Sequence, residues 1–151
     1  MTCYYQRLFA YENWANERIA ECLQAMNQPD ERALELLSHV LAAKITWLNR
    51  LNGISSFVPL WEKHDIIDCM LLLTQNNRAW EVFLKTLTDE KLNSVVTYTN
   101  TKGEAYSTQI QEILTHVINH STYHRGQMVS SLKGKIPVLP VTDYIVFERI
   151  A

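Results

Sequence analysis

Cysteine, glycine and proline are all scarce in this sequence. Its 151 residues include three cysteines, Cys3, Cys22 and Cys69, which are odd in number and form no C-x-x-C pair. No disulfide framework is expected, and such scattered thiols are typical of a reducing intracellular compartment. Only four glycines and four prolines occur. So few turn-forming residues argue against a β-rich fold and favour helices.

Long apolar runs and an excess of basic charge are also missing. No run of about 18 uncharged apolar residues occurs, and the N-terminus lacks a cationic region followed by an apolar one. The formal net charge is -2, and no basic stripe is present, which argues against a nucleic-acid partner. With 47% apolar and 20% charged residues, we expect one soluble, cytoplasmic domain over residues 1–151.

Apolar residues recur every three or four positions in four stretches, and this rhythm predicts four amphipathic helices. The expected helices span about 4–26, 31–51, 64–87 and 109–132. Residues 94–108 alternate β-branched and aromatic side chains around Lys102-Gly103, which predicts a short hairpin. Ser107 or Thr108 would then cap the last long helix, and the tail 135–151 would pack back across the helices. This pattern predicts an all-α four-helix bundle with a short extended excursion before the fourth helix.

The fourth helix carries three of the five histidines, His116, His120 and His124, at intervals of four residues. That interval places side chains on one side of a helix, so His120 and His124 can face a single metal ion. Both lie on the apolar face, where a buried imidazole needs a partner. His116 and Gln127 lie nearer the edge and are candidates to contact and orient the ligands. Arg125 faces away and is expected at the surface or in a helix–helix contact.

A zinc site with one open position usually has three protein ligands, so a third is needed. The candidates are His39, His64, His116 and an inward carboxylate. His64 precedes a helix, and three ligands from one straight helix rarely surround an ion. Elimination therefore leaves His39, although the apolar periodicity of its own helix does not nominate it. The alternative is that His120 and His124 are core histidines, hydrogen-bonded to tyrosine or backbone partners.

Four segments of the chain resemble the DinB/YfiT-like family: YENWANERIAECL, LLSHVLAAKITWLNRL, HVINHSTYHRGQMVSSL and TDYIVFER. The similarity covers nearly the whole chain, and the HxxNHxxxHRGQ run is its most specific part. It implies a four-helix bundle with up-down-down-up connectivity that commonly forms a homodimer. It also implies a divalent metal ion, zinc or nickel, held by His39, His120 and His124.

The same resemblance implies a metal-dependent thiol S-transferase or a related detoxification enzyme. Its substrates would be small molecules, one of them a low-molecular-weight thiol that attacks an electrophile. A metal-dependent hydrolase is the alternative, but it needs a general base that the histidine helix lacks. Asp143 or Glu148 in the tail would have to supply that base. A further alternative is a non-catalytic, stress-induced protein whose metal ion is structural, with four protein ligands.

Overall fold

A computed structural model describes residues 1–150 as mostly helical with one small two-stranded sheet. The long helices are α1 (Thr2–Gln24), α2 (Glu31–Leu51), α3 (Ile66–Lys85) and α5 (Ile110–Leu132). The shorter elements are α4 (Asp89–Asn93), β1 (Val95–Thr99), β2 (Ala105–Gln109) and α6 (Tyr144–Ile150). The four predicted helices and the predicted hairpin are confirmed, with bounds that differ by a few residues. Every described helix is either too short or too polar to span a lipid bilayer.

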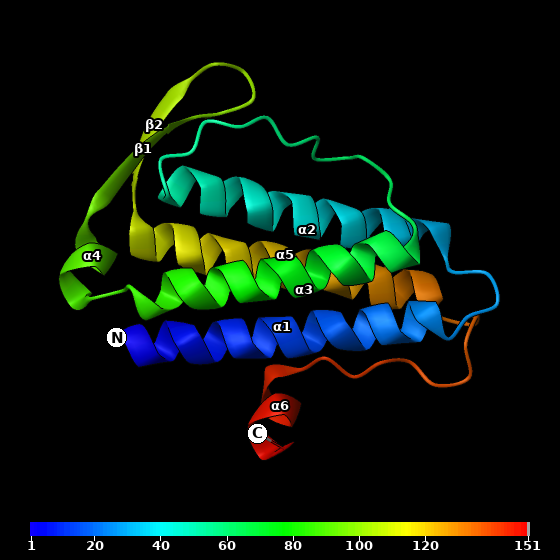
Figure 1. Ribbon diagram of the computed structural model, residues 1–151. Coiled ribbons are helices and arrows are strands. Elements are labelled where there is room, and N and C mark those ends of the chain that lie inside the picture. Colours follow the sequence, from blue (N-terminus) through cyan, green and yellow to red (C-terminus); the bar gives the residue numbers. More distant parts are fainter. Residues whose placement is uncertain (151) are drawn as a thin grey trace.

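The four long helices lie side by side (Figure 1). Helices α1 and α5 run in one direction and α2 and α3 in the other, because the connection 52–65 returns along the length of α2 before α3 begins. Helix α2 packs against α5 and α3, and α1 packs against α3 and α5. The helices therefore form a closed ring in the order α1, α3, α2, α5, with α2 and α5 as neighbours.

Local hydrogen bonds account for where several elements begin. Asp30 and Asp65 cap α2 and α3, since their carboxylates accept from the backbone N–H groups three residues later, at 2.8 and 2.9 Å. Gly103, with a φ of 83°, supplies the positive dihedral of the β1–β2 turn. The predicted cap of α5 is wrong: β2 continues to Gln109, and the hydroxyls of Ser107 and Thr108 instead bond to side chains of β1.

The interior consists of two apolar clusters, one towards each end of the long helices. The cluster nearer the hairpin contains Phe9, Leu48, Trp80, Ile113 and Val117. The cluster at the opposite end contains Ile19, Leu37, Leu41, Leu73 and Met128. Between them lies a layer of buried polar residues, to which each long helix contributes at least one member: Glu12, Asn16, Lys44, Asn76, Ser121 and Arg125.

The tail after α5 packs back on α1, as expected. The ring of Phe147 contacts those of Tyr11 and Trp14, at centroid distances of 5.9 and 5.7 Å. The Tyr11 hydroxyl donates to the carbonyl oxygen of Thr142 at 2.8 Å. These contacts hold α6 against the outer side of α1 (Figure 1).

Candidate metal centre

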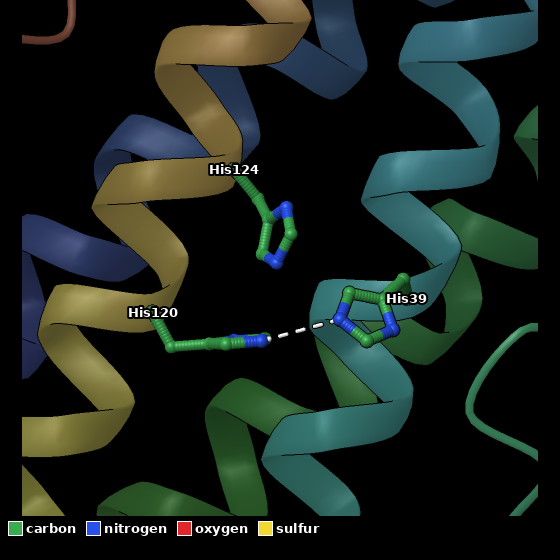
Figure 2. A group of neighbouring side chains, drawn as sticks. All are labelled: His39, His120 and His124. Atoms are coloured by element: carbon green, nitrogen blue, oxygen red, sulfur yellow. Dashed lines mark hydrogen bonds between the residues drawn. The ribbon is translucent and has the colours of Figure 1, made fainter.

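Three histidine side chains converge between α2 and α5. His39 comes from α2, and His120 and His124 come from successive turns of α5 (Figure 2). One ring nitrogen from each histidine lies within 4.8 Å of those of the other two. The Nε2 atoms of His39 and His120 are 3.2 Å apart. The structure thus brings together the three side chains predicted as ligands, and His39 is only 7% exposed.

Hydrogen bonds on the far side of two rings set the tautomers of the cluster. The Nδ1 atom of His39 is 2.9 Å from the carbonyl oxygen of Leu60, which only accepts, so Nδ1 carries the proton. The Nδ1 atom of His124 similarly donates to the side-chain oxygen of Gln127 at 3.1 Å. In a neutral imidazole the other nitrogen then keeps its lone pair. In their neutral forms, His39 and His124 therefore present an unprotonated Nε2 atom.

This donor set fits a divalent metal ion. Neutral imidazole nitrogens are preferred ligands for late divalent ions. Nitrogens bound tetrahedrally at about 2.0–2.1 Å lie roughly 3.3 Å from one another, close to the 3.2 Å between His39 and His120. Among residues 1–150, no carboxylate or thiol joins the three histidines. The cluster can therefore hold an ion with three protein ligands and leave one position open.

The connection between α2 and α3 also holds His39. Besides the Leu60 carbonyl, it contributes Trp61, whose ring stacks on the His39 ring at a centroid distance of 3.8 Å and an angle of 9°. Trp61 is nevertheless 54% exposed. Its contact with His39 had no sequence signal, because an irregular segment has no periodicity from which to infer its position.

The two candidates for orienting the ligands differ in their contacts. Gln127 bonds directly to His124, as the sequence suggests. His116 contacts no ligand nitrogen by a hydrogen bond; its ring lies 5.6 Å from that of His120 and 5.1 Å from that of Trp47. His64 lies outside the cluster, and its backbone N–H bonds to Ser38.

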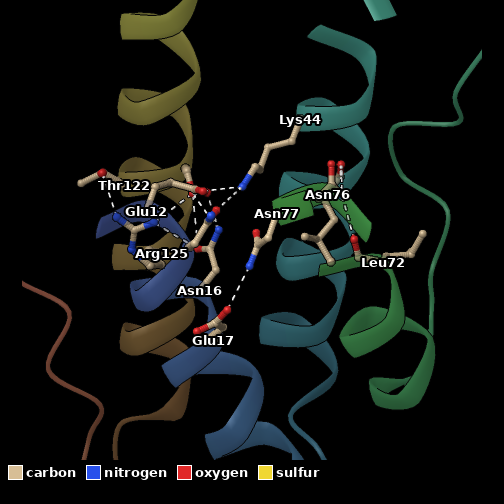
Figure 3. A network of polar contacts seen from close by, with 12 residues as sticks. Glu12, Asn16, Glu17, Lys44, Leu72, Asn76, Asn77, Thr122 and Arg125 are labelled. Atoms are coloured by element: carbon tan, nitrogen blue, oxygen red, sulfur yellow. Dashed lines mark hydrogen bonds and ion pairs between the residues drawn. The ribbon is translucent and has the colours of Figure 1, made fainter. Parts of the chain in front are cut away.

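A buried polar network joins α1, α2 and α5 (Figure 3). Glu12 of α1 accepts hydrogen bonds from Lys44 of α2, from Asn16, and from Ser121 of α5. Arg125 donates to Asn16 at 3.0 Å and to Ser121 at 2.9 Å. Ser121 and Arg125 follow His120 and His124 in the sequence, so the network ties the ligand-bearing turns of α5 to α1.

Arg125 is one of the residues whose position the sequence predicted only in part. It faces away from the histidines and joins two helices, as expected, but it is 1% exposed and does not lie at the surface. Its guanidinium also donates to Tyr11 at 3.1 Å and Thr122 at 3.0 Å. One sequence feature could have indicated that Arg125 is buried: Glu12 and Lys44 are charged residues on otherwise apolar helix faces. Buried charges need partners of opposite sign, so a buried polar network was to be expected.

The two tail carboxylates considered as a general base lie outside the histidine cluster. Glu148 forms an ion pair with Arg7 on the outer side of α1, and this contact lowers the pKa of Glu148 to about 2. Asp143 is exposed, and its backbone carbonyl accepts from the first turn of α6. Neither belongs to the histidine cluster.

Acidification should destabilise the metal-free protein through His120. Burial, and then the neighbouring His124, His39 and His116, lower the pKa of His120 from 6.5 to about 4. Between these values the unfolded chain binds more protons than the folded one. This contribution to stability is therefore complete above pH 6.5 and is lost as the pH falls towards 4. Thermal unfolding in the presence of a chelator should show a falling Tm over this range, and His120→Gln should flatten the slope. An unchanged slope would contradict the assignment.

Removing the side chain of Gln127 should weaken metal binding without unfolding the protein. Gln127→Ala deletes the acceptor that fixes the His124 ring, and losses of this kind cost about ten- to a hundredfold in affinity. Gln127→Glu keeps an acceptor oxygen and is the matched control. Competition with a chromophoric chelator measures both affinities. Equal affinities for Gln127→Ala and the wild type would show that the contact does not orient the ligand.

Comparison with known proteins adds two findings to this geometry. The sequence profile of the DinB family matches residues 1–149. The chain is also 26% identical over 156 aligned positions to Protein DinB of Bacillus subtilis (strain 168), an alignment that covers 91% of this chain and 90% of that protein.

Proposed function

This chain belongs to the DinB family, and we propose that it is a metal-dependent thiol S-transferase whose divalent ion, zinc or nickel, is held by His39, His120 and His124. The observation that carries the proposal is the convergence of three histidine side chains, two of which have their Nδ1 atoms hydrogen-bonded to acceptors on the far side of the ring. In this proposal the four long helices form the up-down-down-up four-helix bundle that the resemblance implies.

The chemistry follows from a site with three protein ligands. A divalent ion held there supplies a Lewis acid that lowers the pKa of a thiol or water in its open position. In the reaction the thiol sulfur bonds to carbon of the electrophile, the leaving group departs with its electron pair, and the thiol proton passes to solvent. The Leu60 carbonyl and Gln127 hold His39 and His124 in orientation, and Trp61 shields one face of His39 from water.

Two other functions have less support. A hydrolase needs a base near the cluster, and the tail carboxylates that were its candidates lie on the α1 side instead. A purely structural ion is normally enclosed by four protein ligands. Within residues 1–150 the cluster has three, which favours a site that takes up an exogenous ligand.

The test is thiol consumption by the purified protein. Wild-type protein loaded with zinc or nickel is mixed with low-molecular-weight thiols and a panel of alkyl and aryl halides. We expect loss of free thiol with at least one pair, no loss after chelation, and recovery when the ion is restored. Turnover that survives chelation, or its absence with every pair, would contradict the proposal. Sedimentation of the same sample tests the expected homodimer.

A further inference from the structure

A cavity of about 350 Å³ lies at the C-terminal end of α2. Its walls are the C-terminal half of α2, the connection after it, and the end of β1 with the following turn. Its volume is within the range of small-molecule sites. Leu60 lines the cavity and also holds His39 through its carbonyl oxygen. Leu60 therefore connects the cavity to the outer side of the His39 ring.

Arg50 is the charged residue in the wall of this cavity. Its guanidinium packs against two aromatic rings that contact each other edge to face, 4.5 Å from the centroid of Trp47 and 4.8 Å from that of Tyr98. One N–H donates to the carbonyl oxygen of Thr99 at 3.3 Å. Among residues 1–150, no carboxylate lies within ion-pair distance of it. A partly buried guanidinium with five donors thus has most of its hydrogen-bonding capacity unused within the chain.

The surroundings of Arg50 are neutral or positive. Burial, and then the charge of nearby Arg50, lower the pKa of His116 below its usual value. Glu104, the one acidic residue of the hairpin, is held by Asn100 at 2.7 Å and Tyr106 at 3.1 Å, and it does not line the cavity. The cavity therefore favours an anion over a neutral or cationic ligand.

Arg50 also faces the same way as the histidine. At about 100° per residue, Thr46 and Arg50 lie within roughly 20° of His39 on the surface of α2. Both line the cavity. Arg50 lies eleven residues after His39, which is about 16 Å along α2 at a rise of 1.5 Å per residue. A molecule that contacts both the histidines and Arg50 must therefore be elongated and extend along this face of α2.

We propose that this cavity binds the carboxylate end of an elongated small substrate, with Arg50 as the residue that selects for the negative charge. A planar guanidinium fork matches a carboxylate in a bidentate contact, and the two rings hold the fork in place. The position of the reacting end at His39, His120 and His124 rests on the proposed function. The carboxylate site itself does not.

The test compares acids with their uncharged amides. The probes are N-benzoylglycine with its amide, and N-acetylcysteinylglycine with its amide, titrated against full-length protein by ¹H–¹⁵N NMR. We expect both acids to bind at least about tenfold more tightly than their amides, with shifts at the indole N–H of Trp47. Arg50→Gln should abolish this preference and Arg50→Lys should retain part of it. Arg78→Gln, which removes one exposed positive charge elsewhere, should leave the preference unchanged.

The N-benzoylglycine pair contains no thiol, so it tests the cavity independently of the metal. In His120→Ala, or after chelation, its acid-over-amide preference should persist, while any extra affinity of the thiol pair is lost. If the acid-over-amide preference persists but the metal-loaded wild type consumes no thiol, the proposed function is contradicted and the carboxylate site is not. Equal binding of acid and amide in the wild type, or an unchanged preference in a folded Arg50→Gln protein, would overturn the carboxylate site.

Discussion

Replacing Glu12 with glutamine should lower the free energy of unfolding by about 3–5 kcal/mol, the usual cost of removing one partner from a buried ion pair. Glu12 is fully buried and is the one carboxylate in a network that also contains Lys44 and Arg125, both about 1% exposed. Without it, two buried cations lose their counter-charge. Urea and thermal unfolding measure the change, and the Tm should fall by about 10 °C.

The matched control for this prediction is Lys44→Met. It removes one of the two cations, but Glu12 stays connected to Arg125 through hydrogen bonds to Asn16 and Ser121. Methionine also fills much of the volume that the lysine occupied. The loss of stability should therefore be clearly smaller than for Glu12→Gln. Equal losses in the two variants would mean that volume, rather than charge balance, dominates this layer.

Much of the fold followed from the sequence because helical periodicity is a strong local signal. The second helix was predicted at 31–51 and observed at Glu31–Leu51, and the hairpin around Gly103 was found where β-branched residues alternate. His120 and His124 were nominated as ligands by their four-residue spacing on an apolar helix face, which also allowed two core histidines. His39 required elimination and family resemblance, because it lies off the centre of the apolar face of its helix.

What the sequence could not provide were contacts between distant segments. Trp61 stacks on His39 from an irregular connection. Arg50 shares the wall of a cavity with the end of β1, about fifty residues later in the chain, and donates a hydrogen bond to Thr99 there. Neither contact has a period or a spacing. The cap of α5 was placed too early for a related reason: pairing with β1 holds Ser107 and Thr108 in a strand, and this tertiary contact overrides the local capping preference.

The buried polar layer and the histidine cluster lie at the same level of the four helices. On α5 the ligand residues alternate with network residues: His120 precedes Ser121, and His124 precedes Arg125. Successive residues of a helix point about 100° apart, so the two members of each pair lie on adjacent sides of α5. The histidines face α2, and Ser121 and Arg125 face α1. Hydrogen bonds to α1 therefore fix the rotation of α5, and with it the direction in which both imidazoles point.

Alanine at His39 or at His120 should each abolish tight binding of a divalent ion, the largest effect expected in this protein. Each change removes one of three nitrogen donors, and His39 is the only one from α2, so its loss leaves two ligands on a single helix. Elemental analysis of untagged protein, after incubation with zinc or nickel and dialysis, should give about one equivalent in the wild type and almost none in either variant. His64→Ala and His116→Ala remove histidines outside the cluster and should retain the ion. A wild type that binds no metal would identify the three histidines as a hydrogen-bonded core group. Loss of the ion in His116→Ala as well would identify His116 as a fourth ligand.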